Sequence, residues 1–109
     1  MSERSTREAT GSISIERQDY AKRGRYVATM PNVHGIARLE YRRERDDLLV
    51  AEHTETSESF QGKGVAEALV RRMVEDARAE GFSIYAQCSY VDEQRRAHPE
   101  WADVFRTFN

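Results

Sequence analysis

The amino-acid sequence predicts an α+β domain with a mixed, mostly antiparallel sheet, a long helix after the fourth strand and a short C-terminal helix. Three patterns support this prediction. Apolar and polar residues alternate within residues 13–56, apolar residues repeat every three or four positions within 65–77, and alternation returns at 82–88. The length of 109 residues corresponds to a single compact domain. We therefore expect one domain over residues 12–109, preceded by a flexible polar tail over residues 1–11.

Alternation predicts four strands in the first half of the chain. Residues 13–16 and 25–30 form the first two, with a turn at 22–24 between them, and residues 35–43 and 48–56 form the next two. Residues 42–47 mix positive and negative charges, so we expect a solvated hairpin loop there. The fourth strand starts with apolar residues and ends with the polar residues Glu52, His53, Thr54 and Glu55, which indicates a site at that end.

The longest regular pattern predicts a helix over residues 65–77 that is stopped by Gly81. A fifth strand follows at 82–88, and a strand, helix and strand in succession favour parallel pairing. We expect a short helix at 91–97. The C-terminal residues should pack through Trp101 and Phe105.

Charge and composition argue against several function classes. The 19 acidic residues nearly balance the 17 basic ones, so no overall field favours nucleic acid or an anionic membrane. The apolar runs are too short to span a bilayer, and the first residues lack the apolar segment of a secretory signal. We therefore expect a cytoplasmic protein with no nucleic-acid or membrane partner.

The single cysteine, Cys88, allows no internal disulfide and offers too few thiolates for a structural zinc site. The histidines His34, His53 and His98 have no recognised metal-ligand spacing with Cys88 or with one another. We expect no bound metal.

A glycine-rich segment stands where the long helix begins, and it reads Gln61-Gly62-Lys63-Gly64-Val65-Ala66. Free backbone N–H groups and the positive end of the helix dipole converge at such a position, which favours an anion such as pyrophosphate. The segment does not fit a Walker loop, and Glu67 replaces the last glycine of a dinucleotide-binding fingerprint. A glycine-rich turn that merely starts a helix is the structural alternative.

In this context the segment resembles the Gln/Arg-x-x-Gly-x-Gly/Ala motif of the GNAT superfamily of N-acetyltransferases, matched by Gln61, Gly64 and Ala66. The chain is similar to the minimal, single-domain members of this superfamily related to the N-acetyltransferase domain-containing protein. That similarity spans residues 13–105, and four segments carry it in order: His53-Thr54-Glu55, Gln61-Gly62-Lys63-Gly64, Cys88-Ser89-Tyr90 and His98-Pro99-Glu100-Trp101. The resemblance implies a GNAT-like fold and the use of acetyl-CoA.

The resemblance also implies a place for each part of acetyl-CoA. The pyrophosphate would lie on the glycine-rich segment, the pantetheine arm would pair with the strand near His53 and Thr54, and the thioester would lie near Cys88. The cofactor-binding residues expected from it are His53, Thr54, Gln61, Gly62, Lys63, Gly64, Val65, Ala66, Cys88, Ser89 and Tyr90.

Acetyl transfer needs an unprotonated nucleophile and a way to protonate the departing thiolate. In direct transfer, His53 or Glu52 would take the proton of the acceptor amine. Strict alternation puts these two residues on opposite faces of the strand, so only one of them would act. In covalent transfer, Cys88 would accept the acetyl group first and His53 would remove its proton. The structural alternatives are a buried cysteine and a hydrogen-bonded histidine at strand ends.

The acceptor is not fixed by the sequence. A chain this short lacks the extra helices that enclose the acceptor in larger members of the superfamily, so a protein or peptide amine is as plausible as a small molecule. We expect a monomer or a weak homodimer. The alternatives to an N-acetyltransferase are a non-catalytic CoA- or acyl-CoA-binding module and a purely structural interaction domain.

Overall fold

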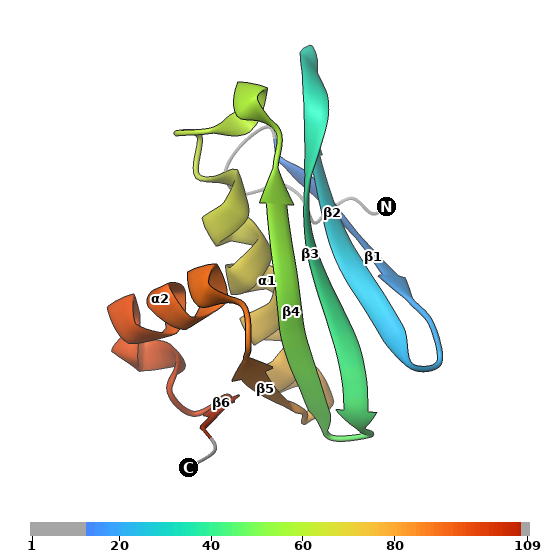
Figure 1. Ribbon diagram of the computed structural model, residues 1–109, viewed down its shortest axis with the longest axis vertical. Coiled ribbons are helices and arrows are strands. Elements are labelled where there is room, and N and C mark those ends of the chain that lie inside the picture. The colour runs from blue at the N-terminus through green and yellow to red at the C-terminus, as the bar shows by residue number, and fades with distance from the viewer. Residues whose placement is uncertain (1–12, 108–109) are drawn as a thin grey trace.

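The computed structural model describes residues 13–107, so the tail expected at residues 1–11 lies outside the described residues. Within residues 13–107 the chain forms six strands, two α-helices and two short 3₁₀ helices (Figure 1). In chain order these are β1 (Ser14–Asp19), β2 (Arg23–Met30), β3 (Val33–Arg45), β4 (Leu48–Thr56), η2 (Glu58–Phe60), α1 (Val65–Glu80), β5 (Ser83–Ala86), α2 (Ser89–Ala97), η3 (Pro99–Trp101) and β6 (Phe105–Arg106).

The strands form one sheet in which sequence order and spatial order coincide, from β1 to β6. The first four strands pair antiparallel, as expected for strands joined by short turns. The long helix α1 then carries the chain back so that β5 pairs parallel with β4, and β6 pairs parallel with β5. The predicted α+β class, with a long helix after the fourth strand and a short C-terminal helix, is confirmed.

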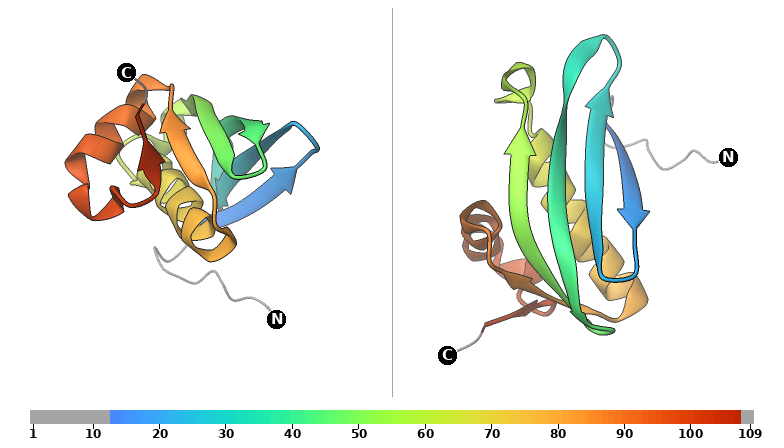
Figure 2. Two further views of the ribbon diagram at one scale, coloured as in Figure 1. Left: turned by 90° about the horizontal axis from the view of Figure 1, so that it is seen from below. Right: turned by 45° about the vertical axis from the view of Figure 1, so that its right-hand side comes forward.

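Helix α1 packs across one face of the sheet, while no helix covers the opposite face of β1–β4 within residues 13–107 (Figure 2). The apolar stripe predicted from the sequence is the buried side of α1, and it meets the inward residues of β2, β3 and β4. Helix α2 joins the same core through Val91. The buried side chains of α1 are Val65, Leu69, Val70, Met73, Val74 and Ala77. We call the uncovered side of β1–β4 the outer face.

The two hairpin connections differ from the predicted ones, the first in position and the second in length. The turn expected at 22–24 lies at 20–22, because Arg23 and Gly24 pair with Arg42 and Tyr41 as strand residues. The solvated loop expected at 42–47 is also wrong in extent. Strand β3 continues to Arg45, and only residues 46–47 form the turn. Charged side chains can line a strand whose face is open to water, so charge alone did not mark a loop.

The expected fifth strand is too long and the expected second helix too short. Strand β5 ends at Ala86, and Cys88 is the residue that precedes α2, which begins at Ser89. The carbonyl of Cys88 accepts the N–H of Asp92 at 3.0 Å, which is a helical bond that alternation in the sequence cannot reveal. The short strand β6 was not predicted, although Trp101 is buried in the core as expected.

A polar network ties α1 to the sheet below it. The buried hydroxyl of Tyr26 donates to Asp76 at 2.8 Å, and Arg17 pairs with the same carboxylate at 3.2 Å. The Tyr41 hydroxyl, also buried, donates to Asp19. Burial raises the pKa of Tyr41 to about 12, and burial beside Asp76 raises the pKa of Tyr26 further. Both tyrosines therefore remain neutral at physiological pH.

Candidate functional site

The glycine-rich segment predicted from the sequence forms an open loop at the N-terminus of α1. Gly62 and Gly64 have φ angles of 79° and 74°, in the left-handed region that glycine adopts without strain. Gly64 is the residue that precedes α1, and it has no side chain to cap the first N–H groups of the helix. These N–H groups and the positive end of the helix are consequently available to an anion.

The loop has space around it and a firm base beneath it. No heavy atom from elsewhere in the described chain lies within 4 Å of where a Cβ would be at Gly62 or Gly64. Gln61 and Lys63 are exposed, whereas Phe60 just before them is only 1% exposed and belongs to the core. Burial of Phe60 fixes the start of the loop, so the exposed backbone after it is held in place. Lys63 adds a positive charge to the loop.

Strands β4 and β5 separate before β4 ends, and α1 begins beside the part of β4 that continues (Figure 1). Their parallel pairing ends at Ala51 and Ala86, and β4 then continues alone on that side to Thr56. The carbonyl of Ala51 accepts the N–H groups of both Gln87 and Cys88, at 3.1 and 2.9 Å, which turns the chain away from β4. The sheet therefore opens between its central strands, and part of the β4 edge has no strand beside it in residues 13–107.

Thr54 and Cys88 face each other across this opening. The Thr54 hydroxyl lies 3.5 Å from the Cys88 sulfur. Thr54 pairs in register with Leu39, which is fully buried, so Thr54 is on the α1 side of β4. Cys88 is partly buried and packs against the same core. These two residues form the inner wall of the opening.

A β-bulge in β4 changes the expected relation between Glu52 and His53. Tyr41 pairs with Ala51 and Glu40 pairs with His53, which leaves Glu52 as the extra residue. Strict alternation, which would put Glu52 and His53 on opposite faces, is therefore interrupted between them. Both lie toward the outer face, since Glu52 binds Arg42 from that face and His53 is opposite Glu40.

The three candidate catalytic residues differ in how they are bound. Both carboxylate oxygens of Glu52 are engaged, by Arg23 at 3.0 Å and Arg42 at 2.7 Å. His53 is exposed and forms no side-chain hydrogen bond or ion pair with any residue described. Cys88 faces Thr54 on the α1 side, so the structure does not bring His53 and Cys88 together on one face.

Tyr90 lies in the first turn of α2, between Cys88 and the start of α1. Burial raises the pKa of Tyr90, and the negative charges of Glu67 and Glu93 raise it further. His98, which follows α2, connects it to the start of α1, because its Nε2 lies 3.4 Å from Glu67 in the first turn of α1 and its ring stacks on Trp101. Tyr90 therefore keeps its proton at physiological pH and packs partly against the core, while Ser89 beside it is exposed.

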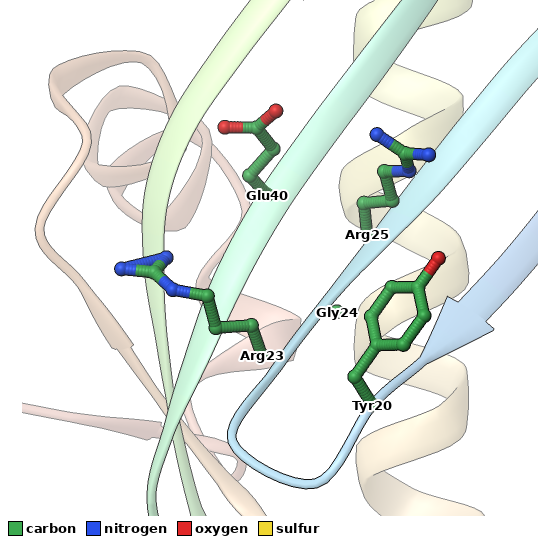
Figure 3. A pocket seen from close by; sticks show the side chains of 5 residues that line it. All are labelled: Tyr20, Arg23, Gly24, Arg25 and Glu40. Atoms are coloured by element: carbon green, nitrogen blue, oxygen red, sulfur yellow. The ribbon is translucent and has the colours of Figure 1, made fainter.

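The outer face carries a pocket that sequence analysis missed. Its lining residues come from the β1–β2 turn, β2 and β3, and they are Tyr20, Arg23, Gly24, Arg25 and Glu40 (Figure 3). Two of them, Arg23 and Gly24, were assigned to a turn. The sequence shows only that one side of β3 is charged and faces solvent, which does not indicate a pocket. The charged residues are Arg38, Glu40 and Arg42.

Within residues 13–107, no group of three or more His, Cys, Asp and Glu side chains is arranged to hold a metal ion. No helix in that part of the chain is long and apolar enough to cross a membrane.

Comparisons with known proteins agree with this architecture. A family model described as GCN5-related N-acetyl-transferase matches residues 25–104. The NMR solution structure of a protein described as a "GCN5-like putative N-acetyltransferase from Staphylococcus aureus" superposes with a TM-score of 0.64. That alignment covers 86% of this chain and 90% of the other, at 22% sequence identity, and it shows a shared fold. No curated protein matches the sequence.

Proposed function

Because the chain belongs to the GCN5-related N-acetyl-transferase family, we propose that it transfers the acetyl group of acetyl-CoA to an amine. The observation that carries this proposal is that a glycine-lined helix N-terminus starts beside the part of β4 that continues beyond its pairing with β5 (Figure 1). An extended cofactor with an anionic end and an amide-bearing arm requires both features side by side.

The residues present fit acetyl-CoA. The N–H groups around Gly62 and Gly64, together with Lys63, would hold the pyrophosphate, because there is open space where its oxygens must approach. The free edge of β4 beyond Ala51 would hydrogen-bond the amides of the pantetheine arm as a strand would. When bound, acetyl-CoA supplies an activated acyl group and a thiolate leaving group.

Two side chains, one on each side of the opening, would carry out the proton transfers. His53 on the outer face would take the proton from the acceptor amine, since its ring is exposed and not bound to any side chain within residues 13–107. Tyr90 on the other side would donate its proton to the departing sulfur, because its raised pKa keeps the hydroxyl protonated. Glu52, bound to two arginines, would hold Arg23 and Arg42 in position.

Direct transfer fits these positions better than a covalent route through Cys88. A covalent route needs a base beside the thiol, but the neighbour of Cys88 is the Thr54 hydroxyl, while His53 is directed to the other face of β4. We assign Cys88 to the inner wall that contacts the cofactor.

Calorimetric titration with acetyl-CoA tests the cofactor site. Gly64→Glu should abolish saturable binding, because the new carboxylate would repel the pyrophosphate. Gly81→Glu is a matched control, since Gly81 has a φ of 82°, equally open surroundings and a place at the other end of α1. Both variants carry similar backbone strain, but only the first should lose binding. Absence of acetyl-CoA binding by the parent protein would refute the proposal.

A second candidate function is a CoA-binding module without turnover. It is favoured because Glu52 is bound by two arginines and because His53 and Cys88 lie on different faces of β4. Such a module would bind acetyl-CoA and CoA with similar affinity and would release no CoA when amines are added. Release of CoA that depends on an amine and on His53 would exclude it.

A further inference from the structure

The outer-face pocket has no role in the acetyl transfer described so far. It opens on the side of the sheet opposite α1, which is the side to which His53 points. Figure 3 shows Arg23 reaching across β3 toward β4, Arg25 extending in a different direction from the same strand, and Glu40 lying between them. No helix covers this face within residues 13–107 (Figure 2), so a ligand can reach the pocket from solvent.

Arg25 differs from every other arginine on β1 to β4. Each of the others forms an ion pair with an aspartate or glutamate. Arg25 is half-buried, and its Nε donates to the neutral side-chain oxygen of Gln18 at 2.6 Å. Arg25 therefore forms no ion pair with a carboxylate among the described residues, although Glu40 lies opposite it in the strand register. Its remaining guanidinium N–H groups are suited to an oxyanion.

We propose that this pocket binds a carboxylate of the amine acceptor, with Arg25 as the charged contact. That the ligand carries an amine rests on the proposed acetyl transfer. That it carries a carboxylate rests on the residues of the pocket alone. Glu40 lines the same pocket and pairs with Arg38 at 3.3 Å. Its negative charge disfavours a doubly charged phosphate more than a singly charged carboxylate.

The position of the pocket sets the length of the acceptor. In the strand register, Arg25 on β2 lies opposite Glu40 on β3, and Glu40 lies opposite His53 on β4. Arg25 and the proposed base are therefore two strand spacings apart. Two spacings separate the two backbones by about 10 Å. The distance between the guanidinium and the imidazole can be shorter, because the Arg25 side chain is long. The acceptor class is therefore an amine separated from its carboxylate by several methylene groups, such as an ω-amino acid or the side-chain amine of a lysine with a free carboxylate.

Two probes of equal length isolate the carboxylate. The full-length ¹⁵N-labelled protein is titrated with 6-aminohexanoate and with 6-aminohexanamide, and binding is followed by NMR at the Gly24 and Arg25 amides and at the Arg25 Nε–H. The acid should bind about tenfold more tightly than the amide, as expected for a hydrogen bond to a charged group. In Arg25→Gln the acid should bind no better than the amide.

The matched control is Arg106→Gln. Arg106 is exposed, lies on β6 and likewise donates to a neutral group, the Ser83 hydroxyl. This variant should keep the preference for the acid. Equal binding of both probes to the parent protein, or acid binding that survives in Arg25→Gln, would overturn the inference. Carboxylate binding by a protein that does not bind acetyl-CoA would support the pocket and refute the proposed acetyl transfer.

Discussion

The hydroxyl of Thr54 lies 3.5 Å from the sulfur of Cys88, across the point where β4 and β5 separate. The backbone of Ala51 makes this contact possible, because its carbonyl accepts the N–H groups of Gln87 and Cys88 and the parallel pairing ends there. The two side chains therefore line the space in which the proposed cofactor arm would run.

Thr54→Phe should fill this opening and lower acetyl-CoA affinity by at least tenfold, because the ring would occupy the space beside the β4 edge. Thr54→Val has nearly the shape of threonine, so it should retain most of the affinity and lose only the contact with Cys88. Calorimetry measures both variants. Equal affinity of the phenylalanine variant and the parent would show that the cofactor does not use this opening.

His53→Ala should lower kcat for acetyl transfer by roughly 10²- to 10⁴-fold, the range expected when a general base is removed. Acetyl-CoA affinity should change little. His34→Ala, which removes another exposed histidine, is the control. The measurement is CoA release with 6-aminohexanoate as acceptor.

Cys88→Ala should keep kcat within a few-fold of the parent value, because direct transfer forms no acetyl-cysteine. Mass spectrometry of the protein incubated with acetyl-CoA alone checks the same point. An acetyl group on Cys88, together with loss of turnover in the alanine variant, would establish the covalent route.

Gly24→Ala should destabilise the fold by about 2 kcal/mol, because a Cβ at Gly24 would overlap the ring of Tyr41. Tyr41 is fully buried and its hydroxyl binds Asp19, so the ring cannot move away freely. Chemical denaturation measures the change. Gly81→Ala meets no neighbouring atom and should cost only about 1 kcal/mol, from its left-handed backbone alone. A smaller loss at Gly24 than at Gly81 would contradict the packing argument.

Stability should fall with rising pH between about 10 and 12. Tyr41 has a pKa near 10 when unfolded and about 12 when folded, so the folded state retains its proton in this window. The stabilisation is complete below the unfolded pKa and is lost as pH rises through the folded pKa. Tyr41→Phe should make the decline in the free energy of unfolding less steep. An unchanged pH slope in that variant would show that another group controls alkaline unfolding.

The sequence predicted the parts of this protein that depend on local pattern. The apolar stripe of α1 and the glycine at its end are visible in the sequence because a helix buries one side and Gly81 can adopt a positive φ. The parallel return of β5 beside β4 follows from a strand, a helix and a strand in succession. The glycine-rich loop is placed where sequence analysis expected it, and its role as a pyrophosphate site is still a prediction.

The tertiary structure decided which side chains meet. The bulge that directs both Glu52 and His53 to the outer face depends on pairing between β3 and β4, and pairing registers are not encoded by alternation within one strand. The contact between Thr54 and Cys88 spans 34 positions and depends on how β5 ends. Arg25 became a candidate ligand only when its neighbours were known, because neutralisation of a charge is a property of the folded surroundings and not of the residue type.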